Sequence, residues 1–453
     1  MRMANIVSEI RQKFGITQEE LAHVLGVSFT SVNAWEGGKR TPQEHMMTVL
    51  TDLLESEQLP QTASDAPSKG FSRTDAGFVS TLLDYNGLRD PLPYTHSIGR
   101  WYGSLPSFLV SDIIKFIQTD FGRTGPILAN FCGSGTIPLE AALHGMNSYG
   151  IDVNPMSVLL SSVKTRIATY SFDDLSAAFQ QVISNRDYCE PPHNAKNLLW
   201  ADNKWFPDAV REATKQLCAG ISQITNYDMQ CVLSVALATI IVNYCNIDKR
   251  CTNHYVYKEN DRFDRARLEE NYYTEIKAYY SAIRSLETIP LYKKPIIQIG
   301  NACSLPFQSD SMEVVFSHPP YGTTINYYSI SRIPLSVLES IAFQKENVVL
   351  DTLRCQSEDI SSGTLPRFNN FTQAWVNEAY RVLKKDGVFV SIIGDSRDGG
   401  KLSHPFTEII ACGEKAGFTL KELFIWVTNH KSGMHVKRKG NHIDHNYVII
   451  MEK

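Results

Sequence analysis

The sequence has few of the features that mark secreted, membrane and metal-binding proteins. Its nine cysteines are scattered and include no C-x-x-C pair, so neither a disulfide framework nor a zinc site is expected. It has no apolar segment typical of an export signal and no run of 18 apolar residues, which argues against export and membrane spanning. We therefore expect a cytoplasmic protein with reduced thiols, no membrane partner and no bound metal.

Positive charge is not in excess either. The 453 residues carry 44 Lys and Arg against 48 Asp and Glu, which gives a formal net charge of −4. This balance excludes a protein that coats nucleic acid through its overall charge, although local basic patches are compatible with it. The length is sufficient for two or three domains with a large core.

The order of apolar and polar segments divides the chain into three parts. Residues 1–56 have the pattern of short helices, and residues 57–77 are rich in Pro, Ser, Gly, Asp and Thr, which is typical of a linker. In residues 78–453, strand-like apolar runs alternate with helical stretches, which indicates an α/β sheet. Residues 156–290 are mainly helical and longer than a simple crossover, so we interpret them as an insert and a candidate for target recognition.

Seven short apolar segments are predicted to form the strands of this sheet. They lie at residues 126–131, 147–152, 296–301, 312–317, 387–395, 418–427 and 445–452. The most apolar run of the chain, residues 231–245, contains Ser, Thr and Asn and is shorter than a membrane span. We predict a buried helix there.

The N-terminal segment 17–42 carries a helix-turn-helix pattern. Thr17 and Glu20 form a capping box, Gly26 provides a turn, and Ser28 caps a second helix. The pattern resembles the helix-turn-helix of the phage-repressor (Cro/C1, XRE-type) family, which implies DNA binding by a recognition helix. In that resemblance the side chains facing the major groove are Phe29, Thr30, Ser31 and Asn33. The alternative is a helical bundle for dimerisation or protein contact, because residues 1–56 hold five basic and seven acidic side chains.

Residues 127–155 have the pattern of a strand, a glycine turn, a helix and a second strand that ends in an acid. Gly133 and Gly135 allow the backbone to turn tightly against a ligand, and Asp152 is placed to accept hydrogen bonds from two ribose hydroxyls. The loop reads F-x-G-x-G and does not contain G-x-G-x-x-G, which disfavours a pyrophosphate site. A purely structural glycine turn is the alternative.

An F-x-G-x-G loop followed by this acid resembles the S-adenosylmethionine site of class I methyltransferases. The resemblance implies that Asn301 binds adenine where relatives commonly have Asp, since an asparagine carbonyl can also accept a hydrogen bond. A looser match at residues 94–114 implies a segment that covers the methionine end of the cofactor. The implied cofactor-binding residues are Phe131, Cys132, Gly133, Gly135, Thr136, Asp152, Asn301, Ala302 and Trp101.

The segment 314–328 reads VVFSHPPYGTTINYY, a buried strand that ends in two prolines. Prolines lack an amide donor and cannot continue a strand. The turn resembles the fourth motif of DNA amino-methyltransferases, in which Asp, Asn or Ser precedes Pro-Pro-Tyr. There an acceptor side chain and a backbone carbonyl bind the exocyclic amine while the aromatic residue stacks on a flipped base. The implied catalytic residues are His318, with Ser317 as an alternative acceptor, and Pro319, Pro320 and Tyr321.

Histidine is an unusual residue at the first position of this motif. A neutral imidazole accepts a hydrogen bond through one nitrogen, whereas a protonated one cannot, so we expect activity to fall as His318 takes up a proton. The aromatics that follow the turn are candidates for the walls of the base pocket. The most basic run of the chain, residues 428–445, is predicted to meet phosphates through Lys431, Lys437 and Arg438, with a solvated hairpin tip as the alternative.

Together these resemblances imply a class I (Rossmann-like) α/β methyltransferase sheet with a helical insert, preceded by a small all-α helix-turn-helix domain. The implied activity is methyl transfer from S-adenosylmethionine to a flipped base of double-stranded DNA, at N4 of cytosine in preference to N6 of adenine. An RNA methyltransferase acting on guanine N2 of tRNA and a transcription regulator with a degenerate methyltransferase fold are the alternatives. A homodimer and a cognate restriction endonuclease are further candidate partners.

Overall fold

The computed structural model describes most of the chain. The described residues are 4–18, 29–38, 72–73, 81–83, 92–99, 101, 103–184, 204–247, 263–321, 327–343, 365–394, 396–398, 401–427 and 445–453, with 21, 42, 47, 50, 51, 53, 54 and 199. They divide into two compact units, residues 1–92 with 422–448 and residues 93–421 with 449–453.

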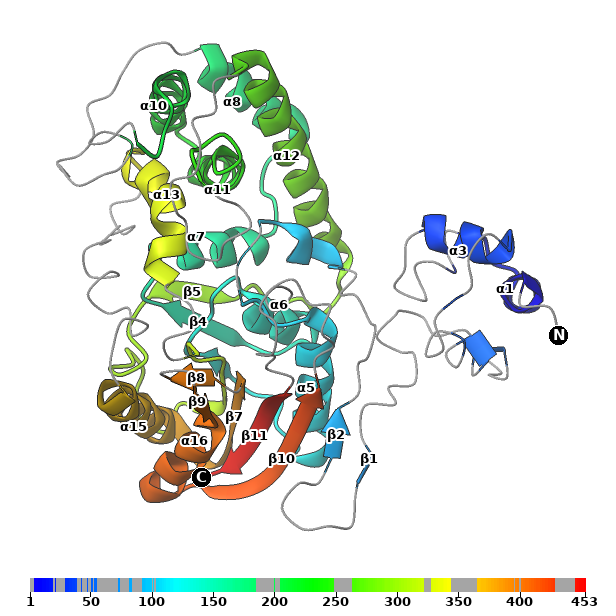
Figure 1. Cartoon of the computed structure of the whole chain (residues 1–453), viewed down its shortest axis with the longest axis vertical. Helices are drawn as coiled ribbons and strands as arrows, with labels where there is room; N and C mark the ends of the chain where they lie inside the picture. The colour runs from blue at the N-terminus through cyan, green and yellow to red at the C-terminus, as the bar shows by residue number, and fades with distance from the viewer. Residues whose placement is uncertain are drawn as a thin grey trace. The chain divides into compact units, whose positions relative to one another are not determined.

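The main sheet has the strand order β1-β2-β10-β11-β7-β6-β3-β4-β5 (Figure 1). Its strands are β1 (Ser72–Arg73), β2 (Thr81–Leu83), β3 (Ile127–Ala129), β4 (Ser148–Asp152), β5 (Ile296–Ile299), β6 (Met312–Ser317), β7 (Leu383–Gly394), β10 (Thr419–Val427) and β11 (His445–Glu452). All seven segments predicted as strands are therefore strands, and β7 begins four residues earlier than predicted. A separate pair, β8 (Ser396–Asp398) and β9 (Lys401–Ser403), is antiparallel.

The strands of the larger unit are parallel from β7 to β5. The register joins Ile127 to Val314 and Tyr149 to Ile296, so the carboxyl ends of β3, β4 and β6 lie at one edge of the sheet. At the end of the chain, Lys453 exchanges backbone hydrogen bonds with Asp386 and Gly387, so β11 runs antiparallel to β7. A parallel sheet of this order with a reversed C-terminal strand confirms the expected class I α/β fold.

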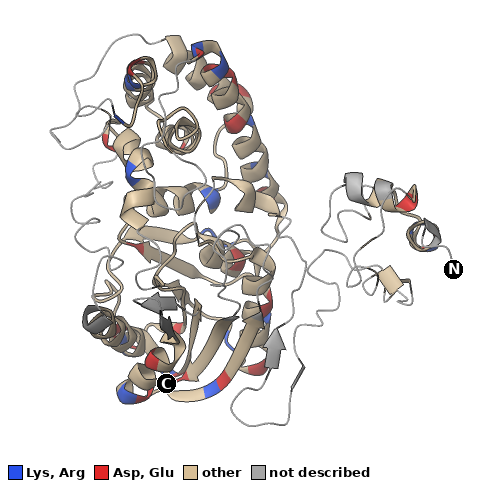
Figure 2. Cartoon of the chain, viewed as in Figure 1, with Lys and Arg blue, Asp and Glu red and all other residues tan. Residues whose placement is uncertain are grey.

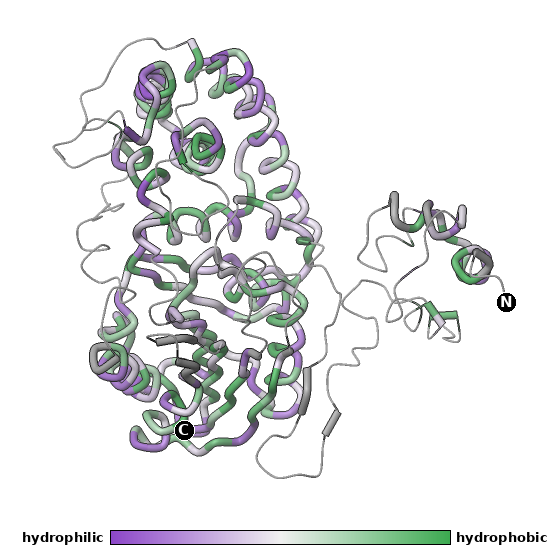
Figure 3. The backbone as a smooth tube through the Cα atoms, in the orientation of Figure 1, coloured by the Kyte–Doolittle hydropathy of each residue, from purple (hydrophilic) through white to green (hydrophobic). Residues whose placement is uncertain are grey.

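Helices cover both faces of this sheet (Figure 1). α6 packs against β3, β4 and α5, α7 packs against β4 and β5, and both α15 and α16 pack against β7. Figure 3 shows largely hydrophobic strands between these helices. The helices are α5 (Ser107–Asp120), α6 (Thr136–Leu143), α7 (Pro155–Lys164), α15 (Leu365–Val382) and α16 (Pro405–Ala416).

The segment predicted as a helical insert contains α7 and, among the described residues, four further long helices, which share an apolar core with α13. Their bounds are α8 (Phe172–Ser184), α10 (Asp208–Ser222), α11 (Tyr227–Ile241), α12 (Arg265–Ser285) and α13 (Tyr327–Glu339). The predicted buried helix corresponds to α11, which is buried on nearly every side, and the Asn226 side chain caps its first turn. Charged residues recur along the outer helices α10 and α12 (Figure 2). No described helix is long and apolar enough to cross a membrane.

The smaller unit contains α1 (Ala4–Phe14) and α3 (Phe29–Glu36), which pack around Val7, Ile10 and Val32. The Arg11 guanidinium binds the Glu36 carboxylate at 2.6 Å and so ties the two helices together. Of the predicted DNA-facing residues, Asn33 is exposed, which leaves it free to face a ligand. The side chains of the other three, Phe29, Thr30 and Ser31, lie outside the described side chains, although their backbone is helical.

Candidate functional site

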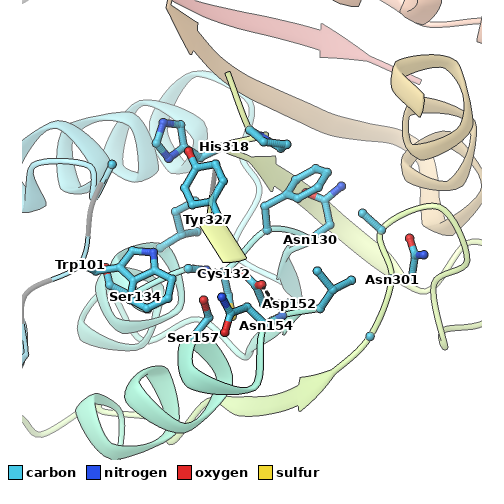
Figure 4. A pocket seen from close by; sticks show the side chains of 18 of the residues that line it. Trp101, Asn130, Cys132, Ser134, Asp152, Asn154, Ser157, Asn301, His318 and Tyr327 are labelled. Atoms are coloured by element: carbon cyan, nitrogen blue, oxygen red, sulfur yellow. Dashed lines mark hydrogen bonds between the residues drawn. The ribbon is translucent and has the colours of Figure 1, made fainter. Parts of the chain in front are cut away.

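A cavity of about 500 Å³ opens at the carboxyl ends of β3, β4 and β6. Figure 4 shows Trp101 and Asn301 toward opposite ends of it, Asp152 between them, and His318 and Tyr327 on one side. The glycine loop, the predicted acid and the His-Pro-Pro turn therefore contribute to one cavity. Its walls are formed by Trp101, Gly103, Ser104, Leu105, Asn130, Phe131, Cys132, Gly133, Ser134, Thr136, Ile137, Asp152, Val153, Asn154, Ser157, Gly300, Asn301, Ala302, Cys303, His318, Pro320, Tyr327, Tyr328, Asn370 and Phe371.

The glycine loop is held in a conformation that other residues would strain. Gly135 has φ 87°, and a Cβ at this position would lie 2.5 Å from the Ser161 hydroxyl oxygen and 3.0 Å from the Ser161 Cα. Gly133 also has a positive φ, 51°, and lies beneath the Trp101 indole. Gly135 itself does not line the cavity, so its role is to let α6 begin at Thr136 directly behind the loop.

Asp152 is fixed by the backbone around it. Its Oδ2 accepts a hydrogen bond from the Gly133 amide and its Oδ1 from the Asn154 amide, both at 2.9 Å. Burial raises the pKa of Asp152 to about 6, against the opposing effect of these amides. The Asn154 side chain caps α7 and donates to the Ser331 hydroxyl of α13 at 2.9 Å. The carboxylate therefore lies at a preorganised point of the cavity with lone pairs still available to a ligand.

The Asn301 side chain is partly committed to its own turn. Its Oδ1 accepts the Cys303 amide hydrogen at 2.8 Å, and the Ser304 amide bonds back to the Asn301 carbonyl at 3.0 Å. Of the two side-chain amide atoms, only the oxygen can accept an amide hydrogen, so this contact distinguishes Oδ1 from Nδ2 of Asn301. Ala302, the next residue, is buried in the cavity wall.

The segment that carries Trp101 is anchored by a buried pair that the sequence alone did not reveal. His96 Nε2 lies 2.6 Å from the Glu140 carboxylate on α6, and both side chains are almost fully buried. Further along, the hydroxyls of Ser104 and Ser134 are 2.9 Å apart. These contacts fasten the covering segment to the helix behind the glycine loop, and they join residues 30 and 44 positions apart.

The His-Pro-Pro turn presents some of its predicted residues to the cavity and buries others. His318 and Pro320 line the cavity, whereas Ser317, Pro319 and Tyr321 do not. The Ser317 hydroxyl is fully buried and donates to Asn130 Oδ1 at 2.6 Å, across the neighbouring strand ends. Tyr321 instead contacts His318: its hydroxyl lies 3.1 Å from Nε2, and the two rings are perpendicular at 89°.

The environment of His318 changes the acid sensitivity expected from the sequence. Burial lowers the pKa of His318 to about 4, because the cavity wall disfavours the charged imidazolium. The ring is therefore neutral, and able to accept a hydrogen bond, at every pH well above 4. Loss of activity through protonation of His318 is therefore expected at a lower pH than for a histidine of ordinary pKa.

Aromatic rings form much of the wall near the turn. Tyr327 and Tyr328 lie at the start of α13, and Phe131 is braced by Phe371 and Trp375 at ring-centroid distances of 6.0 and 5.5 Å. The sequence located aromatics after the turn but could not specify which of them face the cavity. The structure thus provides flat apolar surfaces on which a ring could stack.

One group of predicted contacts, the basic side chains expected to meet phosphates, falls on residues that the structure does not describe. These residues are Lys431, Lys437 and Arg438. In the part of the chain that the structure describes, no group of three His, Cys, Asp and Glu side chains could hold a metal ion.

The donor set of the cavity suits S-adenosylmethionine. A carboxylate at the end of the second strand can accept two ribose hydroxyls, and the glycine loop leaves beneath Trp101 a space that a Cβ at Gly133 would fill. Val153 and Ala302 add apolar surface to the wall of the same cavity. The strand order and the position of the cavity are together those of the class I methyltransferase fold.

Comparison with protein families gives three matches in chain order. Residues 7–56 match a helix-turn-helix family, residues 117–200 an RMKL-like methyltransferase domain, and residues 312–453 a DNA methylase family of the N6/N4 class. These matches confirm the resemblance expected from the sequence, a DNA methylase with an N-terminal helix-turn-helix and S-adenosylmethionine as cofactor. They do not separate the cytosine N4 subtype from the adenine N6 subtype.

Two curated relatives are type II methyltransferases. The chain is 26% identical to M.MvaI of Kocuria varians over 252 residues, 51% of this chain and 54% of that protein. It is 34% identical to M.BsoBI of Geobacillus stearothermophilus over 87 residues, 19% of this chain and 17% of that protein. The chain thus spans about half the length of the first relative and less of the second.

Solved structures of methyltransferases are distant in sequence. An S-adenosylmethionine-dependent methyltransferase of Methanosarcina mazei is 10% identical, with a TM-score of 0.30 over 74% of this chain and 96% of that one. The rRNA methyltransferase aviRa of Streptomyces viridochromogenes is 11% identical, with a TM-score of 0.31 over 78% of this chain and 86% of that one.

Proposed function

We propose that this protein methylates an exocyclic amino group of a flipped base in double-stranded DNA, with N4 of cytosine preferred over N6 of adenine. The observation that carries the proposal is the meeting of the His318-Pro319-Pro320 turn and the Asp152 cofactor end in one cavity. The match of residues 312–453 to DNA methylases supports the same substrate. N4 of cytosine is preferred because the segments after the turn resemble the cytosine N4 branch more closely.

The residues of the turn suit the chemistry of a weak nucleophile. An amine conjugated to a base ring shares its lone pair with the ring, so a hydrogen-bond acceptor on its N–H group must draw it toward tetrahedral geometry. In this proposal His318 is that acceptor, and the two prolines hold the adjacent backbone rigid. Tyr327 and Tyr328 bound the space for a flipped ring. Bound S-adenosylmethionine would supply an electrophilic methyl group, and Asp152 and the glycine loop would orient it in line with the amine.

A labelling assay tests the substrate class. The protein is incubated with S-adenosylmethionine carrying a tritiated methyl group and with DNA, RNA or neither, and the digested nucleosides are then separated. Label in N4-methylcytosine of DNA is the expected result, and label in N6-methyladenine would correct the target atom only. Label confined to tRNA would favour the RNA alternative, and no label in any substrate would favour a regulator with a degenerate fold.

The N-terminal module contributes DNA binding in this proposal. Its match to the helix-turn-helix family and the exposed Asn33 of α3 support a recognition helix. We propose further contacts to phosphates from Lys431, Lys437 and Arg438, and target recognition by the helical segment 156–290. Mobility-shift assays of Asn33→Ala with random duplexes measure the first contribution, and unchanged binding would favour protein interaction.

Partners beyond DNA follow from the same proposal. The two curated relatives are type II methyltransferases, which supports a cognate restriction endonuclease for this chain and a cytoplasmic location with its DNA. Protection of methylated DNA from digestion in extracts of the source cells tests the endonuclease. Light scattering of the purified protein with and without DNA tests the homodimer.

A further inference from the structure

The histidine of the catalytic turn is in contact with the tyrosine of the same turn. His318 Nε2 and the Tyr321 hydroxyl oxygen are 3.1 Å apart, with ring centroids 5.4 Å apart and ring planes at 89°. A perpendicular arrangement directs the edge of one ring at the other and is not a stack. His318 and Pro320 line the cavity whereas Tyr321 does not, so the Tyr321 ring is not part of the wall against which a base would lie.

This contact decides what the other ring nitrogen can do. A neutral imidazole has one nitrogen that donates and one that accepts, and the hydrogen bond made by one nitrogen sets the role of the other. If the tyrosine hydroxyl donates to Nε2, then Nδ1 carries the proton and the ring has no acceptor left for an amine. If Nε2–H donates to the tyrosine oxygen, Nδ1 is a free acceptor.

Only the second arrangement leaves the ring an acceptor for the amine, so it is the one that the proposed function requires. The backbone amide of Gly394, at the end of β7, hydrogen-bonds to the Tyr321 hydroxyl oxygen and occupies one of its two lone pairs. A hydroxyl oxygen accepts as well as donates, so the 3.1 Å contact is compatible with Nε2–H as the donor. Burial raises the pKa of Tyr321 above its ordinary value, so the hydroxyl is neutral.

We propose that Tyr321 is a positioning residue that sets the tautomer of His318, so that Nε2–H donates to the Tyr321 oxygen and Nδ1 accepts the N–H of the exocyclic amine. This inference rests on the proposed function. It assigns the residues of the motif roles that differ from those in the family that the turn resembles. Relatives place Asp, Asn or Ser at the first position and use the aromatic residue for stacking. Here a histidine–tyrosine pair supplies the acceptor, and stacking passes to the rings that line the cavity, Tyr327 and Tyr328.

Tyr321→Phe tests the pair because it keeps the ring and removes only the hydroxyl oxygen. A stacking role predicts little change in this variant. The proposal predicts a kcat about 10- to 100-fold lower, as for other groups that orient a functional histidine, with the affinity for S-adenosylhomocysteine unchanged by calorimetry.

A second background separates positioning from damage to the fold. In His318→Asn the acceptor is a carbonyl oxygen, which has no tautomer to set, so adding Tyr321→Phe to it should cost less than threefold. Equal losses in the two backgrounds, or a wild-type rate for Tyr321→Phe alone, would overturn the proposal.

A spectroscopic readout is independent of activity. In protein labelled with nitrogen-15 histidine, with His318 assigned by its loss in His318→Asn, the wild type should show Nε2 protonated and Nδ1 unprotonated. Tyr321→Phe should show a mixture of the two tautomers. A wild-type spectrum with the proton on Nδ1 would refute the inference, even if His318→Asn proved inactive. Failure of the wild type to label any nucleic acid would instead refute the proposed function, and the tautomer would remain measurable.

Discussion

Asp152 and His318 line the same cavity, and burial disfavours the charged form of each side chain. At neutral pH, however, Asp152 is charged whereas His318 is neutral. Burial raises the pKa of the carboxyl group to about 6 and lowers the pKa of the imidazole to about 4. Above pH 6 the carboxylate is therefore ionised while the histidine is neutral. Asp152 is the only acidic residue among the described residues that line the cavity.

The contrast separates two halves of the cavity. The cofactor half, which we define by Gly133, Asp152 and Asn301, presents an ionised acceptor held by two backbone amides. The base half, which we define by His318 and Tyr327, presents neutral acceptors and aromatic surface. One half is thus suited to hydroxyl groups and the other to an uncharged amine and a flat ring. The following variants should affect one half and leave the other unchanged.

The largest effect is expected from His318→Ala. Removing the acceptor leaves the amine conjugated to its ring, and loss of one preorganised polar group at a reacting centre lowers kcat by about 10²- to 10³-fold. Affinity for S-adenosylhomocysteine should stay within twofold, because the cofactor half is intact. Single-turnover labelling and calorimetry measure the two quantities, and a parallel loss of both would show that the halves are not separable.

Asp152→Ala should have the converse effect. The change removes the acceptor for the ribose and leaves the Gly133 and Asn154 amides without their partner. Hydrogen bonds to a charged group are worth about 1.5–3 kcal/mol, so the Kd for the cofactor should rise about 10- to 100-fold. At saturating cofactor the transfer rate should recover most of its wild-type value. A kcat that stays low at saturation would indicate that Asp152 also orients the reacting methyl group.

The sequence predicted the fold well because each strand is encoded locally. Short apolar runs bounded by turn residues located seven of the nine strands of the main sheet, and only the short β1 and β2 were missed there. The glycines and prolines marked the two loops that meet at the cavity. The order of Phe131, Gly133 and Asp152 then indicated the cofactor through its resemblance to the S-adenosylmethionine site of class I methyltransferases.

Contacts between distant segments could not be predicted in the same way. The pair of His96 and Glu140 and the bond from Ser317 to Asn130 join residues 44 and 187 positions apart, and no local pattern encodes either. Tyr321 was predicted to stack on the base because of its place in a motif. The structure turns it toward His318, since an unusual residue at the first position of the motif offers the tyrosine hydroxyl a nearby partner.

A pH titration compares the two halves in one experiment. Because the ionised form of Asp152 accepts the ribose hydroxyls, cofactor affinity should be constant above pH 7 and weaken as pH falls through about 6, to about tenfold weaker at pH 5. Transfer at saturating cofactor should remain flat down to about pH 5 and fall only near the pKa of His318, about 4. Asp152→Asn is the matched control, which should bind weakly with no pH dependence. A transfer rate that already falls at pH 6.5 would contradict the neutral histidine.

The smallest effect is expected at Asn301, at the end of the cofactor half. Its Oδ1 already accepts the Cys303 amide hydrogen with one of its two lone pairs. We therefore expect the Nδ2 donor to meet the adenine edge, where it suits the acceptor at ring nitrogen N1 better than the adenine amine. Asn301→Asp replaces this donor by an acceptor and should weaken S-adenosylhomocysteine by up to about tenfold, the value of one hydrogen bond. Asn301→Ser keeps an oxygen for the turn and should weaken binding to a similar extent. Calorimetry with the 1-deaza analogue of S-adenosylhomocysteine, which lacks the N1 acceptor, provides the control. The wild type should bind this analogue more weakly than S-adenosylhomocysteine by the same factor, whereas Asn301→Asp should bind the two ligands equally. Tighter binding by Asn301→Asp would instead assign the contact to the adenine amine, as in relatives with aspartate at this position.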